Sequence, residues 1–328
     1  MDEMKIDYGV TRAVENIIGE SDKRSDLISR KLKFGISYLD DSCSGIFPND
    51  VIVISASTGV GKTEAATQIA TFNAMEGKSV LFFALEAEAL EIERRIKYKI
   101  VYDLWHKDNS RQQMKITYAD WYEKKINLTK YEGEAERIFI EKYQGLKMRY
   151  RETDFTIDDF QKALMSEKDE VDLVIIDHLN YFDYEDANEN KAITDIVKKI
   201  RDMALISSKP IILLAHMRKK ERRSLSIMPD LEDIYGSSNV IKIATKVIIL
   251  APYYGDVEVS SIKKPNQFKT LFRVAKNRMN GSATRFIGLT SFDIESNTYD
   301  PVYAVKQYKP YMESLEDIDG PGPSWVNG

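Results

Sequence analysis

The sequence is short of several features that mark particular classes of protein. It has one cysteine, Cys43, which excludes an intrachain disulfide framework. It has neither a signal-peptide pattern nor an apolar run of membrane-spanning length, so we expect a cytoplasmic protein with no membrane partner. Lys and Arg number 47 against 52 Asp and Glu, and the resulting net charge of −5 excludes a general attraction to nucleic acid. Any nucleic-acid binding must therefore depend on a local basic cluster.

The chain does contain enough apolar residues for a sizeable core. Hydrophobic residues make up 43% of its 328 residues, and this length allows one large α/β domain or two smaller ones. Residues 87–100 and 134–150 have helical patterns. Apolar runs typical of buried strands lie at 51–54, 80–84, 171–176, 210–215, 246–251, 270–276 and 285–289.

A phosphate-binding loop is predicted directly after the first strand. The segment Ala56-Ser57-Thr58-Gly59-Val60-Gly61-Lys62-Thr63 lies between that strand and a helix-compatible stretch, 64–70. In such a loop, backbone N–H groups surround phosphate oxygens, Lys62 reaches the β- and γ-phosphates and the Thr63 hydroxyl can ligate Mg²⁺. The sequence therefore predicts ATP and Mg²⁺ as cofactors, bound by Ser57, Thr58, Gly59, Val60, Gly61, Lys62 and Thr63.

Two features of this segment qualify the prediction. A glycine-rich turn with a solvated lysine is the alternative interpretation. Ala56 also stands where the pattern usually has its first glycine, so the backbone there must avoid positive φ or carry strain.

Three polar residues end the strands that follow. Glu86 comes after 80–84 and is a candidate base for an attacking water, or else the N-cap of the helix 87–100. Asp177 closes the run 171–176, as in a Walker B element, and would hold Mg²⁺ through water. His216 follows 210–215 and is either a sensor of the γ-phosphate or a buried histidine with a structural role.

A basic run leaves the strand that carries His216. A solvated face is the ordinary interpretation of such a run, but its position could link nucleotide state to nucleic-acid contact. Because no aromatic residue is interleaved, contact with phosphates is favoured over base stacking. The candidate DNA-binding residues are Arg218, Lys219, Lys220, Arg222 and Arg223.

The C-terminal third predicts a β-hairpin. Asn280-Gly281 between the last two strands indicates a tight turn, and Lys276 and Arg278 would project from one face near its tip. An ordinary charged hairpin is the alternative.

The two ends of the chain differ from the core in composition. Residues 309–328 are acidic and rich in Gly and Pro near their end, which predicts a disordered tail. Charge is high and apolar residues are few in 1–33, which favours an arm with a short helix. This helix either packs, frayed, on its own core or docks on a neighbouring subunit.

The order of these motifs resembles the hexameric RecA-like replicative helicases of the DnaB type, including the helicase halves of phage primase-helicases. The resemblance covers about residues 34–300. It depends on the following segments, which occur in the family's order: Phe34-Gly35-Ile36 with Leu39-Asp40, Ser44-Gly45-Ile46, the phosphate loop, Phe83-Ala84-Leu85-Glu86, Ile175-Ile176-Asp177-His178, Leu214-Ala215-His216-Met217 and Ala275-Lys276-Asn277-Arg278-Met279-Asn280-Gly281.

The resemblance implies roles for several residues. Glu86 would be the catalytic glutamate and His216 the γ-phosphate sensor. The segment 217–235 would be the central DNA-binding loop, and Lys276 with Arg278 would enter the ATP site of a neighbouring subunit. The departures are Ala56, Thr245-Lys246 where the family often has an aspartate, and the lack of a primase or helical collar domain within these 328 residues.

The sequence as a whole therefore predicts an α/β fold with a RecA-like P-loop NTPase core at 34–308, an N-terminal arm at 1–33 and a tail at 309–328. We expect an ATP- and Mg²⁺-dependent helicase that moves on single-stranded DNA as a homohexamer during replication. A primase, polymerase or loader acting in trans would be its partners, in a bacterial or infected-host cytoplasm. The alternatives are a recombinase-like filament ATPase and a KaiC-like or loader-type regulatory ATPase.

Overall fold

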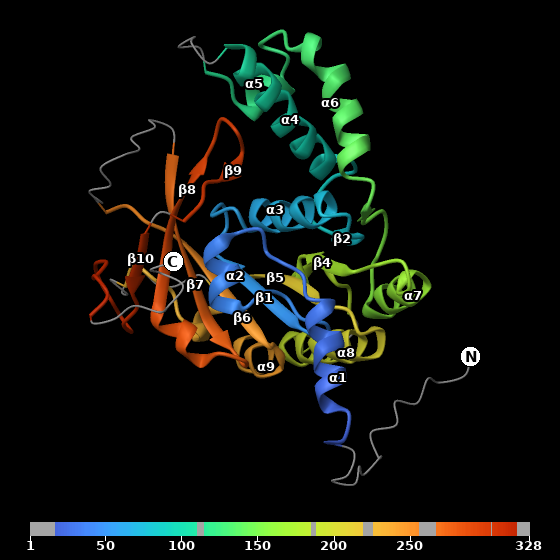
Figure 1. Cartoon of the computed structure of the whole chain (residues 1–328), viewed down its shortest axis with the longest axis vertical. Coiled ribbons are helices and arrows are strands. Elements are labelled where there is room, and N and C mark those ends of the chain that lie inside the picture. Colours follow the sequence, from blue (N-terminus) through green and yellow to red (C-terminus); the bar gives the residue numbers. More distant parts are fainter. Residues whose placement is uncertain are drawn as a thin grey trace.

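The computed structural model describes residues 17–109, 115–184, 188–218, 226–255, 267–302 and 304–319 (Figure 1). Four of the candidate DNA-binding residues, Lys219, Lys220, Arg222 and Arg223, lie outside these ranges. Within them, no helix is long and apolar enough to cross a bilayer.

One sheet organises the described chain, in the order β10-β8-β7-β6-β1-β5-β4-β2-β3, with β9 paired to β8. The six strands from β6 to β3 in this order are parallel, whereas β7, β8, β9 and β10 pair antiparallel. This confirms the predicted mostly parallel α/β sheet. The strands are β1 (Val51–Ala56), β2 (Val80–Ala84), β3 (Leu146–Tyr150), β4 (Leu173–Asp177), β5 (Ile211–His216), β6 (Lys246–Pro252), β7 (Gln267–Asn277), β8 (Phe286–Asp293), β9 (Thr298–Tyr299) and β10 (Ala304–Gln307).

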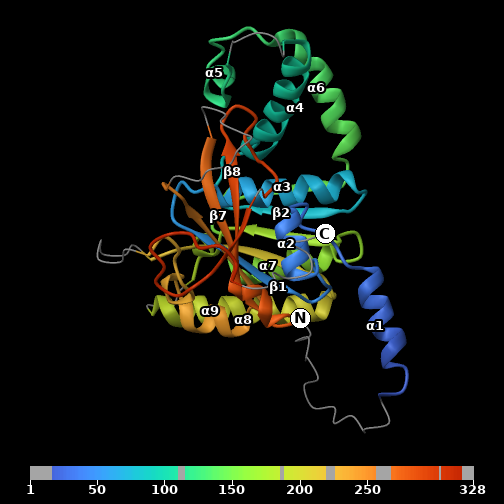
Figure 2. The same ribbon diagram turned by 60° about the vertical axis from the view of Figure 1, so that its left-hand side comes forward.

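Helices cover both faces of this sheet, as Figures 1 and 2 show. Successive side chains of a strand point to opposite faces, so the apolar run of β1 serves two cores. Val51 and Val53 pack with residues of α7, α8 and α9, whereas Ile52 and Ile54 pack with α2 and α3. The α-helices are α1 (Glu20–Ser29), α2 (Ser37–Cys43), α3 (Lys62–Met75), α4 (Glu91–Asn109), α5 (Tyr118–Tyr122), α6 (Thr129–Lys142), α7 (Ile157–Glu167), α8 (Glu189–Ser207) and α9 (Ser237–Ile243).

Helices α4, α5 and α6 extend beyond one end of the sheet, at the top of Figures 1 and 2. They have an apolar cluster of their own, which includes Tyr98, Trp105 and Leu128. Ile92 and Ile96, in the first turns of α4, still pack on the main core. The helix after β2 thus begins on the sheet and ends in a separate small core.

Two local predictions differ from the structure. The helix predicted over 134–150 ends at Lys142, and 146–150 forms the edge strand β3. Leu146, Met148 and Tyr150 pack on the core, while the basic residues between them form ion pairs with acidic residues, which is the period of a strand.

The predicted two-residue turn at Asn280-Gly281 is also wrong, although β7 and β8 do form an antiparallel pair. Their pairing stops at Arg273 and Ile287, and β7 continues to Asn277 alongside β6. The 3₁₀-helix η4 (Gly281–Arg285) lies in the connection. The pairing of β7 with β6 therefore overrides the local turn signal.

The two ends of the described chain behave differently. Helix α1 has no buried residue and projects from the body in both views (Figures 1 and 2). The tail was predicted to be disordered, but within 309–319 the side chain of Met312 is buried and its carbonyl accepts a hydrogen bond from Ile227 N at 2.9 Å. The prediction considered the acidic composition of the tail and overlooked Met312, whose apolar side chain packs on the core. Residues 320–328 lie outside the described ranges.

The single cysteine gives a direct test of this fold. Cys43 is fully buried at the end of α2, and burial raises the pKa of its thiol to about 12. We therefore expect no reaction with Ellman's reagent in the native protein at pH 8 and one thiol equivalent after unfolding in guanidinium chloride. Prompt reaction of the native protein would contradict the packing of α2 on the sheet.

Candidate nucleotide-binding site

Strand register brings the predicted site residues to one edge of the sheet. Ala56 at the end of β1 lies opposite His216 at the end of β5, and Ala84 at the end of β2 lies opposite Asp177 at the end of β4. The carboxyl ends of parallel strands therefore present the phosphate loop, Glu86, Asp177 and His216 together. Together with residues from the C-terminal strands they surround a cavity of about 1060 Å³.

The phosphate loop has left-handed backbone only where glycine provides it. Gly59 has φ 81° and Gly61, which precedes α3, has φ 96°. Ala56 is the last residue of β1 and does not have positive φ, so the missing first glycine causes no strain there. The Lys62 ammonium donates to the carbonyl of Ala56 at 3.0 Å and lies 3.1 Å from His216 Nδ1. Burial lowers the pKa of Lys62, while Asp177 and Glu86 act to raise it.

Thr63 and Asp177 meet where the predicted Mg²⁺ site lies. The Thr63 hydroxyl donates to Asp177 Oδ2 at 2.7 Å, and Asp177 is 2% exposed. Its other oxygen, Oδ1, is buried and finds no donor among the residues of the described ranges. Burial raises the pKa of Asp177 to about 6, and Glu86 adds to this, while the hydrogen bond from Thr63 and the charge of Lys62 oppose it. A buried carboxylate with a free oxygen beside a threonine hydroxyl fits Mg²⁺.

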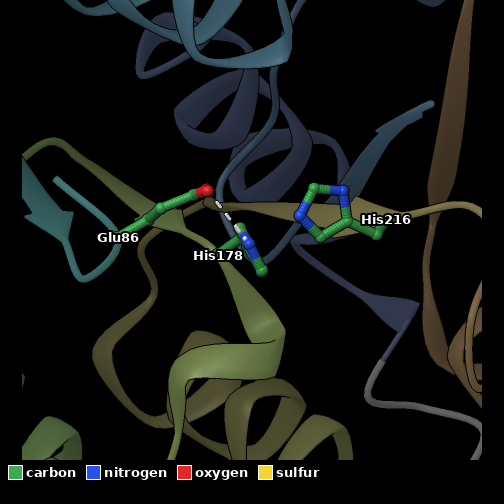
Figure 3. Close-up of side chains that lie close together, drawn as sticks. All are labelled: Glu86, His178 and His216. Atoms are coloured by element: carbon green, nitrogen blue, oxygen red, sulfur yellow. Dashed lines mark ion pairs between the residues drawn. The ribbon is translucent and has the colours of Figure 1, made fainter. Parts of the chain in front are cut away.

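The backbone of Glu86 is held by the end of β4 and not by a helix. Its N–H donates to the carbonyl of Asp177 at 3.2 Å, and α4 begins only at Glu91, so the N-cap interpretation does not hold. Figure 3 shows Glu86 beside His178, with Oε2 of the carboxylate 3.1 Å from Nε2 of the imidazole. This pair is not aligned as a hydrogen bond. Burial, with His216 and Lys62, lowers the pKa of His178 to about 3, so the contact joins a carboxylate to a neutral ring.

The hydrogen bonds of the two histidines fix which nitrogens carry protons. Nδ1 of His178 accepts from the N–H of Asn180 at 3.2 Å, so its proton is on Nε2. Nδ1 of His216 faces the Lys62 ammonium, so His216 also carries its proton on Nε2. Burial and Lys62 lower the pKa of His216.

These tautomers bear on a second possible metal site. Glu86, His178 and His216 offer ligand atoms within 4.8 Å of one another. A protonated Nε2 on His178 cannot bind a metal ion, however, and the ring is held in this tautomer by Asn180. The cluster instead provides one carboxylate and two neutral N–H donors at the mouth of the phosphate loop.

The first turn of α3 is also tied to α4. Glu64, which follows the Mg²⁺ candidate Thr63, is 5% exposed and pairs with Arg95 at 2.6 Å and with Lys99 at 3.4 Å. Arg95 lines the cavity and also pairs with Glu91 at 2.9 Å. Burial lowers the pKa of Lys99, and Glu64 opposes this. The two helices therefore meet through a buried carboxylate and two half-buried cations at the wall of the site.

The basic run begins directly at the site. Met217 pairs with Ile234, and the backbone N–H of Tyr235 donates to the carbonyl of His216 at 3.0 Å. Arg218 is exposed, and its own N–H donates to the carbonyl of Asp233 at 2.7 Å. The segment from Arg218 to Asp233 thus starts and ends next to the candidate sensor.

Lys276 and Arg278 lie at the opposite edge of the sheet. Their neighbour Asn277 pairs with Lys246, and Lys246 pairs with Ile52 near the start of β1. The Lys276 ammonium donates to the carbonyl of Ala244 at 2.7 Å, at the C-terminus of α9. Arg278 is exposed, and the fold brings it near neither the phosphate loop nor Glu86 of its own chain. The structure thus separates these two residues from the other candidates.

Thr245 and Lys246, which stand where the family often has an aspartate, also have a structural role at this edge of the sheet. The Lys246 ammonium, 2% exposed, forms an ion pair with Asp50, and the Thr245 hydroxyl donates to the other oxygen of Asp50 at 2.7 Å. The buried lysine is therefore paired, as a charge in a core must be.

Two features of the site were missed in the sequence. His178 directly follows Asp177, and its place after a strand end could have singled it out. Arg95 lies 31 positions after Glu64, and no local pattern links them.

The raised pKa of Asp177 predicts a stability cost. The proton binds more tightly to the folded than to the unfolded chain, so the fold loses stability as the pH rises through about 6. Without metal or nucleotide, Asp177→Asn should therefore raise the melting temperature at pH 7.5 by roughly 2 to 6 °C, with a smaller gain at pH 5. Asp172→Asn, directly before the start of the same strand, is the control. An equal or lower melting temperature for Asp177→Asn at pH 7.5 would contradict the assignment.

Known proteins resemble this chain along most of its length. The model of the DnaB-like helicase C terminal domain matches residues 32–291. The replicative DNA helicase DnaB of Mycoplasma genitalium is 25% identical over 303 residues, covering 88% of this chain and 59% of the relative. That of Mycoplasma pneumoniae is 24% identical over 307 residues, with the same coverage. The chain spans about three fifths of the length of these curated relatives.

Solved structures share the fold. A DnaB-like replicative helicase superposes with a TM-score of 0.65 at 15% identity, over 89% of this chain and 68% of the other. A second solved structure, an ATPase domain, gives 0.67 at 15% identity, over 89% and 100%. A KaiC-like protein from Pyrococcus horikoshii gives 0.55 at 18% identity, over 84% and 99%. The structural matches extend beyond one family, whereas the sequence model covers residues 32–291, which is most of the chain, so the chain belongs to the DnaB-like helicase C-terminal domain family.

Proposed function

We propose that this chain is the motor of an ATP-dependent DNA helicase that translocates on single-stranded DNA as a homohexameric ring during replication. The observation that carries the proposal is the convergence of Lys62, Thr63, Asp177, Glu86 and His216 on one cavity, in a chain that belongs to the DnaB-like family. The cavity is large enough for a nucleoside triphosphate.

Each residue has a role that its surroundings support. The N–H groups of the phosphate loop and the Lys62 ammonium bind the phosphates. Thr63 and the free oxygen of Asp177 would hold Mg²⁺, which when bound offsets the charge on the β- and γ-phosphates. Glu86, at the mouth of the site, accepts a proton from the attacking water. His216 donates its Nε2 proton to the γ-phosphate, because Lys62 occupies Nδ1.

The same arrangement would connect hydrolysis to DNA. The backbone that follows His216 leads into the basic run of Arg218, Lys219, Lys220, Arg222 and Arg223. A change in the hydrogen bond between His216 and the γ-phosphate would be passed to this segment through the bond from Tyr235 to the carbonyl of His216. We assign contacts with the phosphates of single-stranded DNA to the basic residues.

Partners follow from the same proposal. Among the structural matches is a DnaB-like replicative helicase described with its interactions with primase. We extend this to the present chain and include a polymerase or loader as further partners acting in trans, in the bacterial or infected-host cytoplasm. The likeness to a KaiC-like protein supports the second candidate function, a regulatory ATPase without strand separation. Closed rings on single-stranded DNA with an ATP analogue, seen by negative-stain imaging, would favour the helicase over this ATPase and over a filament-forming recombinase.

The role of Glu86 can be tested with a neutral isostere. Glu86→Gln should bind ATP as the wild type does, because the packing is kept, but its hydrolysis should fall by at least about a hundredfold. Glu88→Gln is the matched control, because the Glu88 side chain is more exposed and forms an ion pair with Arg94 on the surface. Hydrolysis by Glu86→Gln at the wild-type rate would show that Glu86 is not the base.

A second test addresses the shared site. If Arg278 acts on the nucleotide of a neighbouring subunit, Arg278→Ala should bind ATP and lose roughly 10³-fold or more in turnover. Lys62→Ala subunits retain the arginine and lose the phosphate loop. Mixing the two variants should restore activity at mixed interfaces, whereas each variant alone stays inactive.

The control for this experiment is Arg285→Ala, an exposed arginine in the same connection between β7 and β8. It should hydrolyse ATP normally. If mixed oligomers form without any recovery of activity, or if Arg278→Ala alone is fully active, the shared-site mechanism fails.

A further inference from the structure

A residue from the far end of the chain lies against the phosphate loop. Strand β9 is beside the start of α3 in Figure 1. Its Tyr299 is 4% exposed, and the hydroxyl donates to the carbonyl oxygen of Val60 at 2.7 Å. The same hydroxyl lies 3.3 Å from the carbonyl oxygen of Gly61. A single proton serves the shorter contact first, so the Val60 carbonyl is the main acceptor.

The hydrogen bond to the Val60 carbonyl also fixes the orientation of the Gly61 N–H. The C=O of Val60 and the N–H of Gly61 belong to one planar trans peptide, in which the two groups point in opposite directions. A donor that holds the carbonyl from behind therefore holds the N–H in front. Gly61 lines the cavity, so its N–H is one of the loop groups available to a phosphate oxygen.

Tyr299 is itself held firmly enough to act as a fixed support. Its backbone N–H donates to Gln68 Oε1 at 3.1 Å, and its carbonyl accepts from Gln68 Nε2 at 3.4 Å. Its ring packs edge-on against Phe272 and Phe292, with centroids 5.2 and 5.0 Å away. The residue is thus anchored to α3, β7 and β8 at once.

The fit between Tyr299 and the loop leaves no space for a side chain. A Cβ added to Gly61 would lie 2.4 Å from the Tyr299 hydroxyl oxygen, and the φ of Gly61 already disfavours any other residue. Gly59 also has positive φ but has no atom within 4 Å of an added Cβ. The close contact is therefore particular to the peptide that Tyr299 holds.

We propose that Tyr299 is a positioning residue of the phosphate loop, whose hydroxyl orients the Val60–Gly61 peptide so that the Gly61 N–H faces the phosphates before nucleotide binds. The proposal rests on the proposed nucleotide-binding function. Preorganised donors do not have to be ordered when the ligand arrives, and this raises affinity. Because β9 pairs with β8, the antiparallel strands at the C-terminal end of the sheet support the phosphate loop that follows β1.

The test removes the hydroxyl alone. Tyr299→Phe should weaken binding of both ATP and ADP by about 3- to 10-fold, as measured by titration with fluorescent nucleotide analogues. Both ligands carry the β-phosphate, so the two losses should be equal. The effect lies in ground-state binding, so the KM for ATP should rise by a similar factor while kcat stays within about twofold.

Tyr38→Phe is the matched control. Tyr38 is also buried, at 2% exposure, and its hydroxyl donates to the carbonyl of Phe286 at 2.8 Å, away from the cavity. Both variants lose one hydroxyl-to-carbonyl hydrogen bond, so their melting temperatures should fall by similar amounts. Only Tyr299→Phe should lose nucleotide affinity. In nucleotide-free protein, amide hydrogen exchange of the peptide that covers 57–63 should be faster in Tyr299→Phe alone.

The outcomes separate this proposal from the one on which it rests. Affinity of Tyr299→Phe within twofold of the wild type, or equal losses in both variants, would overturn the positioning role. If the wild type itself binds neither ATP nor ADP, the proposed function fails. In that case the exchange of 57–63 decides the positioning role alone, and unchanged exchange in Tyr299→Phe overturns it.

Discussion

The parallel pairing of β1 with β5, and of β4 with β2 and β5, is the constraint on which the site depends. Parallel strands end at the same edge, so residues 56, 84, 177 and 216 come together although they are far apart in the chain. Strand β7 runs antiparallel to both of its neighbours, so it begins at this edge and carries Asn277, at its end, to the opposite one. The topology of the sheet therefore decides which polar residues share the cavity and which lie at the opposite edge.

Gathering these polar groups at one edge of the sheet lowers the stability of the protein when no ligand is bound. Burial raises the pKa of Asp177 and lowers those of Lys62 and His178, so each charged form is disfavoured by its surroundings. Asp177 also retains an oxygen without a donor in the part of the chain that the structure describes. Phosphate and metal ion would supply the opposite charges that these groups lack. The site thus gives up stability when empty in return for groups already in place for a ligand.

The sequence alone predicted the parts of the fold that have local signals. The apolar runs located seven strands, and the polar residues that follow 80–84, 171–176 and 210–215 lie at the cavity as expected. It failed where a partner from elsewhere in the chain decides the outcome. Residues 146–150 become β3 because β2 has a free edge, and the turn at Asn280-Gly281 is displaced because β6 holds Asn277. Tyr299 had no local signal, since its partner Val60 is 239 positions away.

Arg278 lies too far from the phosphate loop of its own chain to act there, and this favours a site shared between subunits. Its peptide N–H donates to the carbonyl of Thr245 at 2.9 Å, which places it at the edge where the parallel strands begin. The phosphate loop follows the end of β1, at the other edge. Arg278 also acts to lower the pKa values of Arg201 and Lys276, so positive charges are gathered there. One rigid sheet cannot bring both edges to the same nucleotide. If Arg278 takes part in hydrolysis, it does so in another subunit through a head-to-tail contact. Such a contact closes into a ring or continues as a filament, depending on the rotation between neighbouring subunits.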